Sequence, residues 1–260
     1  MSSGGPQPQH ITSRDNPWLK ELRRLAQDNA AARRQGRAWL EGDHLCRAAL
    51  TRGRQPSEAV FAESFWPEAP QDWWRGAGRV VVLPDALFAS ISGLESPARM
   101  GFVIDLPEVA TPTAGMASVV LDRVQDAGNV GSILRSASAF GFGQVIALRG
   151  SAALWSPKVL RAGMGAHFNL QLLEGLAPDV LPTLKLPLVV TSSHRGQWLH
   201  EANLPWPCAW VMGHEGQGVS GEIEAQASHF VRIAQPGGEE SLNVAAAAAI
   251  CLHASGTARR

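Results

Sequence analysis

The stretch that decides the fold reads Ile233-Ala-Gln-Pro-Gly-Gly-Glu-Glu-Ser-Leu-Asn-Val244 and continues as an alanine-rich segment to Ser255. A glycine-rich loop leads directly into a helix, and the polar residues Ser241 and Asn243 are predicted where that helix begins. The first N–H groups of a helix have no partner within it, and glycine lets a backbone approach a ligand closely. Small alanines allow the helix to pack tightly against a sheet or a second subunit. The stretch therefore predicts a binding loop held in place by a buried helix.

Length and composition limit the class of protein. The 260 residues allow one large domain or two of modest size, and 45% of them are hydrophobic, enough for a substantial core. No apolar run reaches the roughly 18–20 residues that a membrane-spanning helix needs, so we expect no membrane association. Residues 1–10 lack a charged segment followed by an apolar core, which excludes a secretory signal and predicts a flexible tail.

The cysteines and the charges give two further expectations. Cys46, Cys208 and Cys251 are far apart, which argues against a disulfide framework or a zinc site and indicates a reducing, cytoplasmic location. Residues 1–54 hold ten Lys/Arg and five Asp/Glu (net +5), and the remainder holds thirteen against eighteen (net −5). A basic segment on an acidic body suggests a module that binds a polyanion. A solvated helix face explains the same count, and charge alone favours that simpler interpretation.

The chain divides at residues 107–117, which are rich in proline, glycine and threonine and are predicted to form a linker. Before it, helical spacing and short β-like runs predict a small α/β domain over residues 11–106. The expected helices there are 18–27 and 44–51, and the expected strands are 38–41, 59–62, 79–83 and 100–106.

After the linker the pattern becomes regular. Short apolar runs alternate with helical stretches, at 117–121, 144–148, 169–173, 188–191, 209–212 and 230–233. Strands that alternate with helices predict a parallel sheet covered on both faces, here over residues 118–260.

Besides the opening stretch, a segment directly after the strand that ends near Asp122 could carry chemistry. In it Asn129 is a natural N-cap residue, and Gly131 and Arg135, four residues apart, share one face of the helix. An arginine near the carboxyl end of a strand would point into the crevice where open α/β sheets bind ligands. An ordinary cap and a surface arginine are the alternative.

A third segment follows the run at 209–212. Gly216, Gly218 and Gly221 satisfy the G-x-G-x-x-G pattern of dinucleotide-binding loops. That pattern normally opens the first unit of its domain, whereas here it follows the fifth strand, and Glu215 at its mouth would repel a pyrophosphate. A loop that admits an uncharged part of an adenosine-type cofactor fits better, with nicotinamide binding a distant alternative. The histidines show no metal-ligand spacing, so no metal is expected.

Together the three segments resemble the three motifs of the SpoU (TrmH-type) RNA 2′-O-ribose methyltransferases, part of the SPOUT class. The matches are Asn129-x-Gly131-x-x-x-Arg135, Gly213-x-Glu215-x-x-Gly218 and Gly237-x-x-x-Ser241-Leu-Asn-Val244, in that order. Many relatives have Pro-Met after the isoleucine of the third motif, where this chain has Ala234-Gln235. Many also have serine after Asn-Val, where this chain has Ala245.

The N-terminal half resembles the accessory RNA-binding domain of the same family, which is similar to the ribosomal L30e/L7Ae fold. The likeness rests on Ile11-Thr-Ser-Arg-Asp-Asn16, Leu22, Arg33-Arg34-x-Gly36 and Leu40-Glu41-Gly42. The whole resemblance implies an RNA substrate-binding domain followed by a SPOUT domain with a parallel sheet and a deep C-terminal trefoil knot. It also implies S-adenosylmethionine (AdoMet) as cofactor, a homodimer, and RNA as partner.

The resemblance assigns roles to individual residues. It implies catalytic roles for Asn129, Arg135, Glu215, Ser241 and Asn243, and cofactor binding by Thr191, Gly213, Gly218, Ile233, Gly237 and Leu242. In the first domain, the basic residues expected to contact RNA are Arg14, Arg23, Arg24, Arg33, Arg34 and Arg37.

The reaction implied is methyl transfer to a ribose 2′-hydroxyl, with 23S ribosomal RNA as the expected substrate and transfer RNA as the alternative. An arginine side chain is almost always protonated, so Arg135 is expected to act as a fixed cation rather than as a base. Glu215 is expected to position Asn129 or Arg135. A catalytically silent RNA-binding or ribosome-assembly relative is the main alternative from another class of protein.

Overall fold

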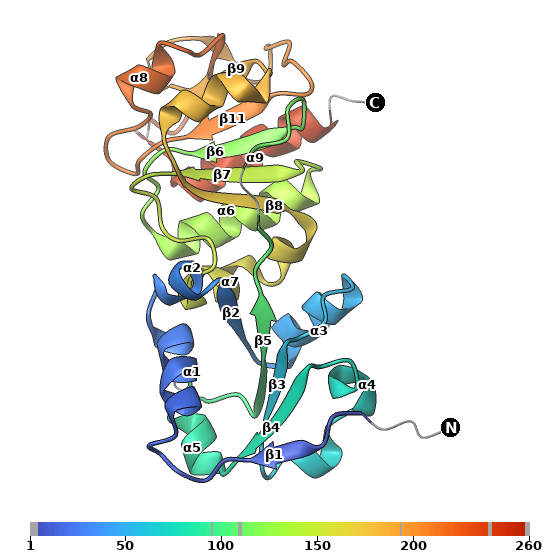
Figure 1. Cartoon of the computed structure of the whole chain (residues 1–260). Coiled ribbons are helices and arrows are strands. Elements are labelled where there is room, and N and C mark those ends of the chain that lie inside the picture. Colours follow the sequence, from blue (N-terminus) through green and yellow to red (C-terminus); the bar gives the residue numbers. More distant parts are fainter. Residues whose placement is uncertain (1–4, 95, 109–110, 193, 239–240, 258–260) are drawn as a thin grey trace. The chain divides into compact units, whose positions relative to one another are not determined.

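The computed structural model describes residues 5–94, 96–108, 111–192, 194–238 and 241–257 (Figure 1). The chain forms two compact units. The first unit contains Met1–Glu108 together with Trp155–Phe168, and the second contains Val109–Leu154 and Asn169–Arg260. The predicted division near residue 108 is thus found, but a later segment also belongs to the first unit. None of the described helices is both long enough and apolar enough to cross a membrane.

The first unit is built on a mixed five-stranded sheet. Its strands, in spatial order, are β1 (Pro8–His10), β4 (Arg79–Leu83), β3 (Glu58–Ala62), β5 (Met100–Asp105) and β2 (Arg37–Glu41). The first three are parallel, and β5 runs antiparallel to both β3 and β2. The four strands expected from the sequence are all present.

Short helices complete the first unit: α1 (Pro17–Gln27), α2 (Ala31–Gln35), α3 (Asp43–Thr51), η1 (Trp66–Glu68), α4 (Gln71–Trp74), α5 (Asp85–Ala89), α7 (Pro157–Gly163) and η2 (Ala166–Asn169). Although α7 lies far along the chain, it packs against α1 and β2 of this unit.

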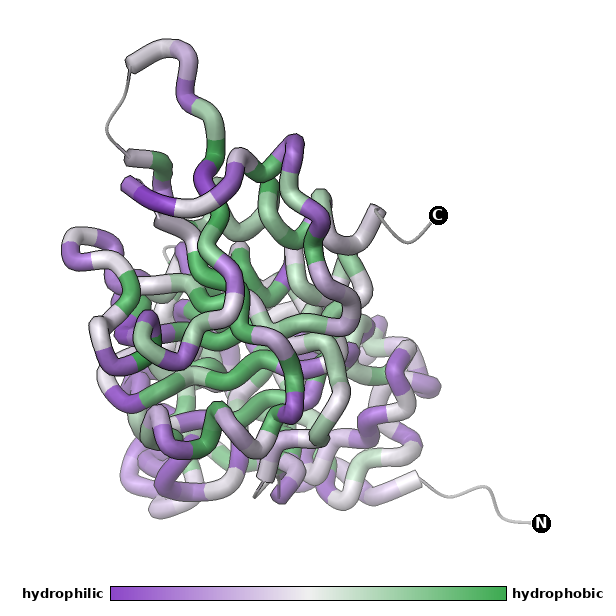
Figure 2. The backbone as a smooth tube through the Cα atoms, turned by 90° about the horizontal axis from the view of Figure 1, so that it is seen from above, coloured by the Kyte–Doolittle hydropathy of each residue, from purple (hydrophilic) through white to green (hydrophobic). Residues whose placement is uncertain are grey.

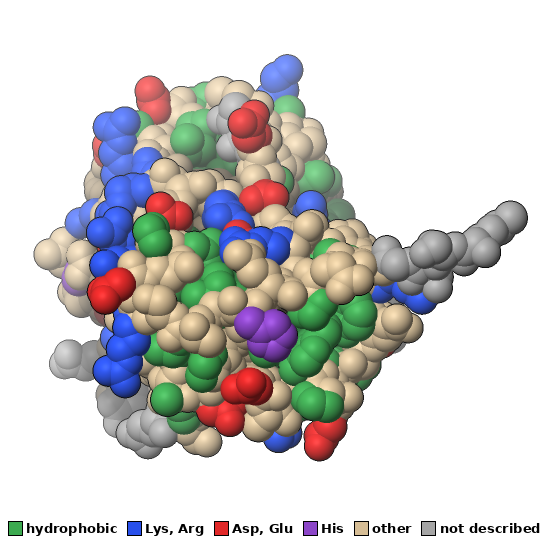
Figure 3. Space-filling view, turned by 60° about the horizontal axis from the view of Figure 1, so that its bottom comes forward, with side chains coloured by type: hydrophobic (Ala, Val, Ile, Leu, Met, Phe, Trp, Pro, Cys, Tyr) green, Lys and Arg blue, Asp and Glu red, His purple; other side chains and the backbone are tan. Residues whose placement is uncertain are grey.

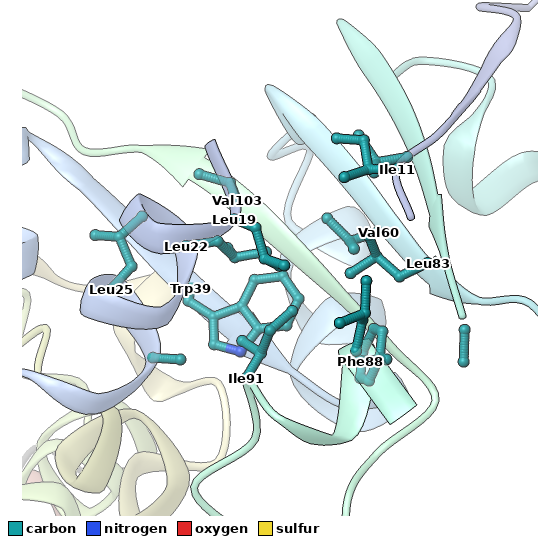
Figure 4. Close-up of a cluster of buried hydrophobic side chains, with 14 of the residues drawn as sticks. Ile11, Leu19, Leu22, Leu25, Trp39, Val60, Leu83, Phe88, Ile91 and Val103 are labelled. Atoms are coloured by element: carbon teal, nitrogen blue, oxygen red, sulfur yellow. The ribbon is translucent and has the colours of Figure 1, made fainter. Parts of the chain in front are cut away.

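Helix α1 shows how the sequence builds this core. The Asn16 side chain accepts a hydrogen bond from the Trp18 N–H at 3.0 Å, and a proline follows as the first helical residue, which favours a helix start here. Leu19, Leu22 and Leu25 then fall on one buried face. They pack around Trp39, whose ring lies near the ring of Phe88 (Figure 4).

The second unit is a seven-stranded sheet in which every listed neighbour pair runs parallel. Its strands, in spatial order, are β10 (Gln197–Trp198), β12 (His229–Arg232), β9 (Leu188–Thr191), β11 (Ala209–Met212), β6 (Ser118–Leu121), β7 (Gln144–Leu148) and β8 (Gln171–Leu176). The helices of this unit are α6 (Ala127–Ala139), η3 (Pro178–Leu184), α8 (Gly221–Glu224) and α9 (Val244–Thr257).

Both faces of this sheet are covered, as the alternation of strands and helices predicts. On one face, Val120, Val190 and Val211 share a buried cluster with Leu181 of η3 and Ile223 of α8. Elsewhere in the unit α6 packs against α9, and the indole N–H of buried Trp210 donates to Ser255 Oγ of α9 at 2.8 Å. Figure 2 shows the hydrophobic segments running through the interior, with hydrophilic residues concentrated in the outer loops.

Two predicted segment boundaries need correction. The tail predicted at 1–10 is too long, because Pro8–His10 pairs with β4; residues 1–4 lie outside the described part. The linker predicted at 107–117 is in part fixed to the second sheet. The side chain of Gln144 bonds the backbone of Thr113, that of Gln171 bonds the Thr111 carbonyl, and the Gly115 N–H donates to Leu184. Residues 109–110 of that linker are outside the described residues.

Candidate active site at the carboxyl ends of the strands

Three loops of the second unit leave the carboxyl ends of β6, β11 and β12. Because these strands are parallel, their carboxyl ends meet at the same edge of the sheet, which is where open α/β sheets bind ligands. The three loops lie at residues 122–126, 213–220 and 233–243. They carry the three segments singled out in the sequence.

The residue that caps α6 differs from the prediction. Asp126, not Asn129, is the N-cap: its backbone is extended and its Oδ1 accepts the Asn129 N–H at 2.8 Å. Asn129 is instead the third residue of the helix. Since its side chain is not needed for capping, it can bond to other loops.

Asn129 joins the second loop to the third. Its Nδ2 donates to Glu215 Oε1 at 3.2 Å, and its Oδ1 accepts from Asn243 Nδ2 at 2.9 Å. Asn243 Oδ1 in turn accepts the N–H groups of Ala245 and Ala246 at 2.9 and 3.2 Å, which makes Asn243 the cap of α9. The direction of each amide follows, because a carboxylate can only accept and a backbone N–H can only donate. We call this set the Glu215–Asn129–Asn243 chain.

Glu215 also holds the entrance to α6. Its carboxylate accepts the N–H groups of Asp126 at 3.1 Å and Gln125 at 3.3 Å. Partial burial would raise the pKa of Glu215, but these backbone bonds, one from its own backbone and one from the Asn129 amide outweigh it. The pKa of Glu215 therefore lies below its usual value. The predicted role of Glu215 in positioning Asn129 agrees with these contacts.

The other two expected catalytic residues do not join this chain through any contact among the described residues. Arg135 is exposed on α6, six positions beyond Asn129 and so about 9 Å further along the helix axis. Within the described ranges its guanidinium has no hydrogen-bond or ion-pair partner. Ser241 is exposed and lies before α9, so the expectation that it sits at the helix start is wrong. Asn243 takes that position.

The glycines of the second loop close it on itself. His214 and Gly218 exchange backbone hydrogen bonds of 3.0 and 2.8 Å, and Gly218 has a φ of 69°. A side chain on Gly213 would collide with the backbone of Gly218 and Val219. These residues are therefore needed for the tight turn itself. Helix α8 after the loop has only four residues, so the loop lacks the long helix of a dinucleotide-binding unit.

The remaining residues expected at the cofactor lie on the same edge of the sheet. Thr191 ends β9, Ile233 directly follows β12, and Gly237 is exposed in the third loop. Leu242 of that loop is 38% exposed, and the buried Oε1 of Gln235 has no hydrogen-bond partner among the described residues. No group of three or more His, Cys, Asp or Glu residues in the described ranges could hold a metal ion.

The basic residues of the first unit fall into two sets. Arg14, Arg24 and Arg33 are exposed and have no partner in the described ranges. Arg23 donates to Ser90 Oγ at 2.8 Å, Arg34 pairs with Asp28, and Arg37 pairs with Glu58 and, at 3.4 Å, Asp105. The pairing of half-buried Arg37 with a buried carboxylate gives it a role in the fold. Figure 3 shows a run of Lys and Arg side chains on the left, the side on which Figure 1 places α1.

Fold and site together define an α/β protein with a ligand-binding edge built from three loops. Residues 116–253 match the model of the SpoU rRNA Methylase family, to which the chain belongs. It is 34% identical to slr1673 of Synechocystis, named an uncharacterized tRNA/rRNA methyltransferase, over 94% of this chain and 92% of that protein. It is 29% identical to RlmP of Bacillus subtilis, a 23S rRNA (guanosine(2553)-2′-O)-methyltransferase, over 82% of this chain and 86% of RlmP.

Solved structures agree. A structure of an RNA 2′-O ribose methyltransferase is 29% identical and aligns with a TM-score of 0.76 over 96% of this chain and 99% of its own. The expected fold class is confirmed: an α/β SPOUT unit with a parallel sheet, whose class carries the deep C-terminal trefoil knot, beside a smaller α/β unit. The likeness of that smaller unit to the L30e/L7Ae fold stays a prediction.

The sequence reasoning missed Asp122, Arg123 and Asp126 as site residues. Asp126 could have been found, because an aspartate three positions before Asn129 has the spacing of an N-cap to the N3 backbone N–H. Nothing in the local sequence shows that Arg123 adopts a left-handed backbone, with a φ of 59°.

We expect Glu215→Ala to lower the free energy of unfolding by about 1 kcal/mol or less at neutral pH, since water can replace much of what an exposed carboxylate provides. Because the folded pKa is depressed, this contribution is complete above the usual value of 4.5 and is lost as the pH falls below it. Urea denaturation of both proteins between about pH 7 and pH 3 measures it. Glu222→Ala, on the exposed start of α8, is the control. A difference between wild type and Glu215→Ala that stays constant down to the lowest pH would contradict the assignment.

Proposed function

We propose that this protein transfers the methyl group of AdoMet to a ribose 2′-hydroxyl of RNA, with large-subunit ribosomal RNA as the substrate. The observation that carries the proposal is the Glu215–Asn129–Asn243 chain. It ties together the three loops that hold the three family motifs. The 23S substrate in the name of RlmP supports ribosomal RNA. Transfer RNA is the second candidate, supported by the tRNA/rRNA name of slr1673.

The loops fit AdoMet in two respects. Exposed Leu242 offers an apolar surface for a nucleoside, and Gln235 Oε1 is a buried acceptor without a partner among the described residues. AdoMet carries N–H donors on its adenine and its ammonium group, either of which would satisfy such an oxygen. Backbone groups of Gly213, Ile233 and Leu242, with Thr191, Gly218 and Gly237 around them, would hold the cofactor. When bound, AdoMet supplies the activated methyl group.

The protein side chains would then prepare the 2′-hydroxyl. A hydroxyl is a weak nucleophile, so charge must be stabilised as its proton leaves. Arg135 would hold the adjacent phosphate through two N–H groups and stabilise the developing alkoxide, while a phosphate oxygen or water takes the proton. Asn129, Asn243 and Ser241 would orient the ribose. Glu215 is ionised at neutral pH and acts by fixing Asn129.

We propose a homodimer with the active site at the subunit interface. Two features support it: Arg135 lies about 9 Å along α6 from Asn129 and makes no contact with the Glu215–Asn129–Asn243 chain, and Ile250 on α9 is 42% exposed. A second copy could cover that part of α9 and complete the site. Sedimentation equilibrium that returns the monomer mass at micromolar concentration would rule the dimer out.

We expect Arg135→Ala to reduce methyl transfer to RNA by a factor of about 100 or more, because a fixed cation at the reacting oxygen is lost. The affinity for AdoMet should stay within about twofold of wild type. Calorimetry with AdoMet and incorporation of labelled methyl into RNA measure the two effects.

Arg149→Ala, at another exposed arginine of the second unit, is the matched control for Arg135→Ala and should retain activity. Full activity of Arg135→Ala would remove the assignment. A wild-type protein that binds AdoMet and RNA but transfers no methyl group would instead favour the catalytically silent relative. Mapping of 2′-O-methyl sites in RNA from a deletion strain would identify the target.

The first unit is expected to bind RNA through its unpaired arginines. Arg24→Ala combined with Arg33→Ala should weaken RNA binding and reduce the slope of log affinity against log salt by about 1 to 2, because each lost phosphate contact releases fewer counterions. Filter binding over a salt series measures the slope. The control is the pair Arg52→Ala and Arg54→Ala, also exposed but outside the predicted set. Equal effects of the two pairs would show that only overall charge matters.

A further inference from the structure

Arg123 holds an unfavourable backbone conformation at the edge of the candidate site. It follows the buried Asp122 directly after β6, and its φ of 59° lies in the left-handed region that side-chain-bearing residues rarely adopt. Among the described residues, only Met164 and Lys185 share this feature without being glycine. Strain of this kind persists where the surrounding structure requires it, and it is concentrated at functional sites.

The turn at Arg123 directs its guanidinium onto the loop that follows β11. Nη1 donates to Gln217 Oε1 at 2.8 Å, and Nη2 donates to the Gly218 carbonyl at 3.4 Å. Nε donates to Asp122 Oδ1 at 3.1 Å. The other oxygen of Asp122 accepts the Ser220 N–H at 2.6 Å. Two consecutive residues of one loop therefore hold three residues of another.

The stem of Arg123 is itself fixed in place. Gly150, with a φ of 91°, passes so close that a side-chain carbon there would lie 3.1 Å from Arg123 Cγ. The next residues of that segment hold the end of β6, since Ser151 Oγ donates to the Leu121 carbonyl at 3.0 Å and the Ala152 N–H donates to the Val124 carbonyl at 2.9 Å. The guanidinium is thus presented from a rigid support.

The 213–220 loop needs such an external hold. Its internal bonds, between His214 and Gly218 and from the Gly216 and Gln217 N–H groups to His214 Nδ1, fix its shape but not its place on the sheet. Its place depends on Glu215, which reaches α6 on one side, and on Asp122 and Arg123 on the other.

We infer that Asp122 and Arg123 are positioning residues that lock the 213–220 loop onto the end of β6 and so preset the AdoMet site. The inference rests on the proposed function, because the loop matters through the backbone of Gly213 and Gly218 and through Glu215. Arg123 itself is not assigned a contact with substrate. Its effect on the reaction passes through the loop.

The test compares two left-handed positions. Arg123→Gly removes the guanidinium while glycine accepts the backbone conformation without strain. We expect the dissociation constant for AdoMet, measured by calorimetry, and the KM for AdoMet to rise about tenfold or more, which corresponds to about 1.4 kcal/mol, with the KM for RNA unchanged. Lys185→Gly, at a φ of 51° in the turn before β9, relieves the same kind of strain and should change neither constant.

A second variant protects the test against misfolding of the first. Gln217→Ala alters an exposed side chain and removes one bond of the lock, so AdoMet affinity should fall about two- to fivefold. Wild-type AdoMet affinity in Arg123→Gly would overturn the inference, and so would wild-type affinity in Gln217→Ala if Arg123→Gly does not fold.

Hydrogen exchange separates this inference from the proposed function. In the protein without AdoMet, exchange of the Ser220 and Gly218 amides should accelerate in Arg123→Gly and not in Lys185→Gly. If wild type binds no AdoMet, the proposed function fails, while faster exchange would still support the lock. Unchanged exchange would refute the lock even in an active enzyme.

Discussion

The site depends on one property of asparagine, whose side chain carries a donor and an acceptor on the same carbon. Asn129 uses both: its nitrogen serves a carboxylate and its oxygen serves a second amide. Three loops that are far apart in the sequence are joined through that one group. An aspartate there could not donate, and a leucine could do neither, so the arrangement requires an amide and not merely a polar residue. The capping of α9 by Asn243 extends the same direction of hydrogen bonds to a helix end.

Two aspartates make this arrangement possible by taking tasks that other residues could have had. Asp126 caps α6 and so leaves the Asn129 amide available. Asp122 accepts from the backbone of the second loop, so that loop is held from the β6 side as well as through Glu215. The 213–220 loop is therefore fixed at both flanks, although it is short, rich in glycine and exposed. A loop of this composition would otherwise be mobile, and a binding site that must be ordered first binds more weakly.

Much of the fold was predictable, because short apolar runs bounded by turn residues mark strands in a covered parallel sheet. The strands at 144–148, 188–191 and 209–212 match the prediction to the residue. β1 and β10 were not found, since two or three partly polar residues carry no periodic signal. The order of the three motifs indicated which loops meet, but not which side chain does what. Asp126 and Asn129 are both good N-caps, as are Ser241 and Asn243, and the choice between them depends on backbone angles that the sequence does not display.

The segment Trp155–Phe168 lies between β7 and β8 in sequence yet belongs to the first unit, so the backbone passes between the two units three times. A module joined by one covalent connection can be exchanged by recombination as a single cassette. Here a replacement N-terminal part would arrive without the inserted strap that completes it, and its buried apolar face would be exposed. Diversification of nucleic acid recognition in such a chain must therefore proceed by point substitution on the existing surface.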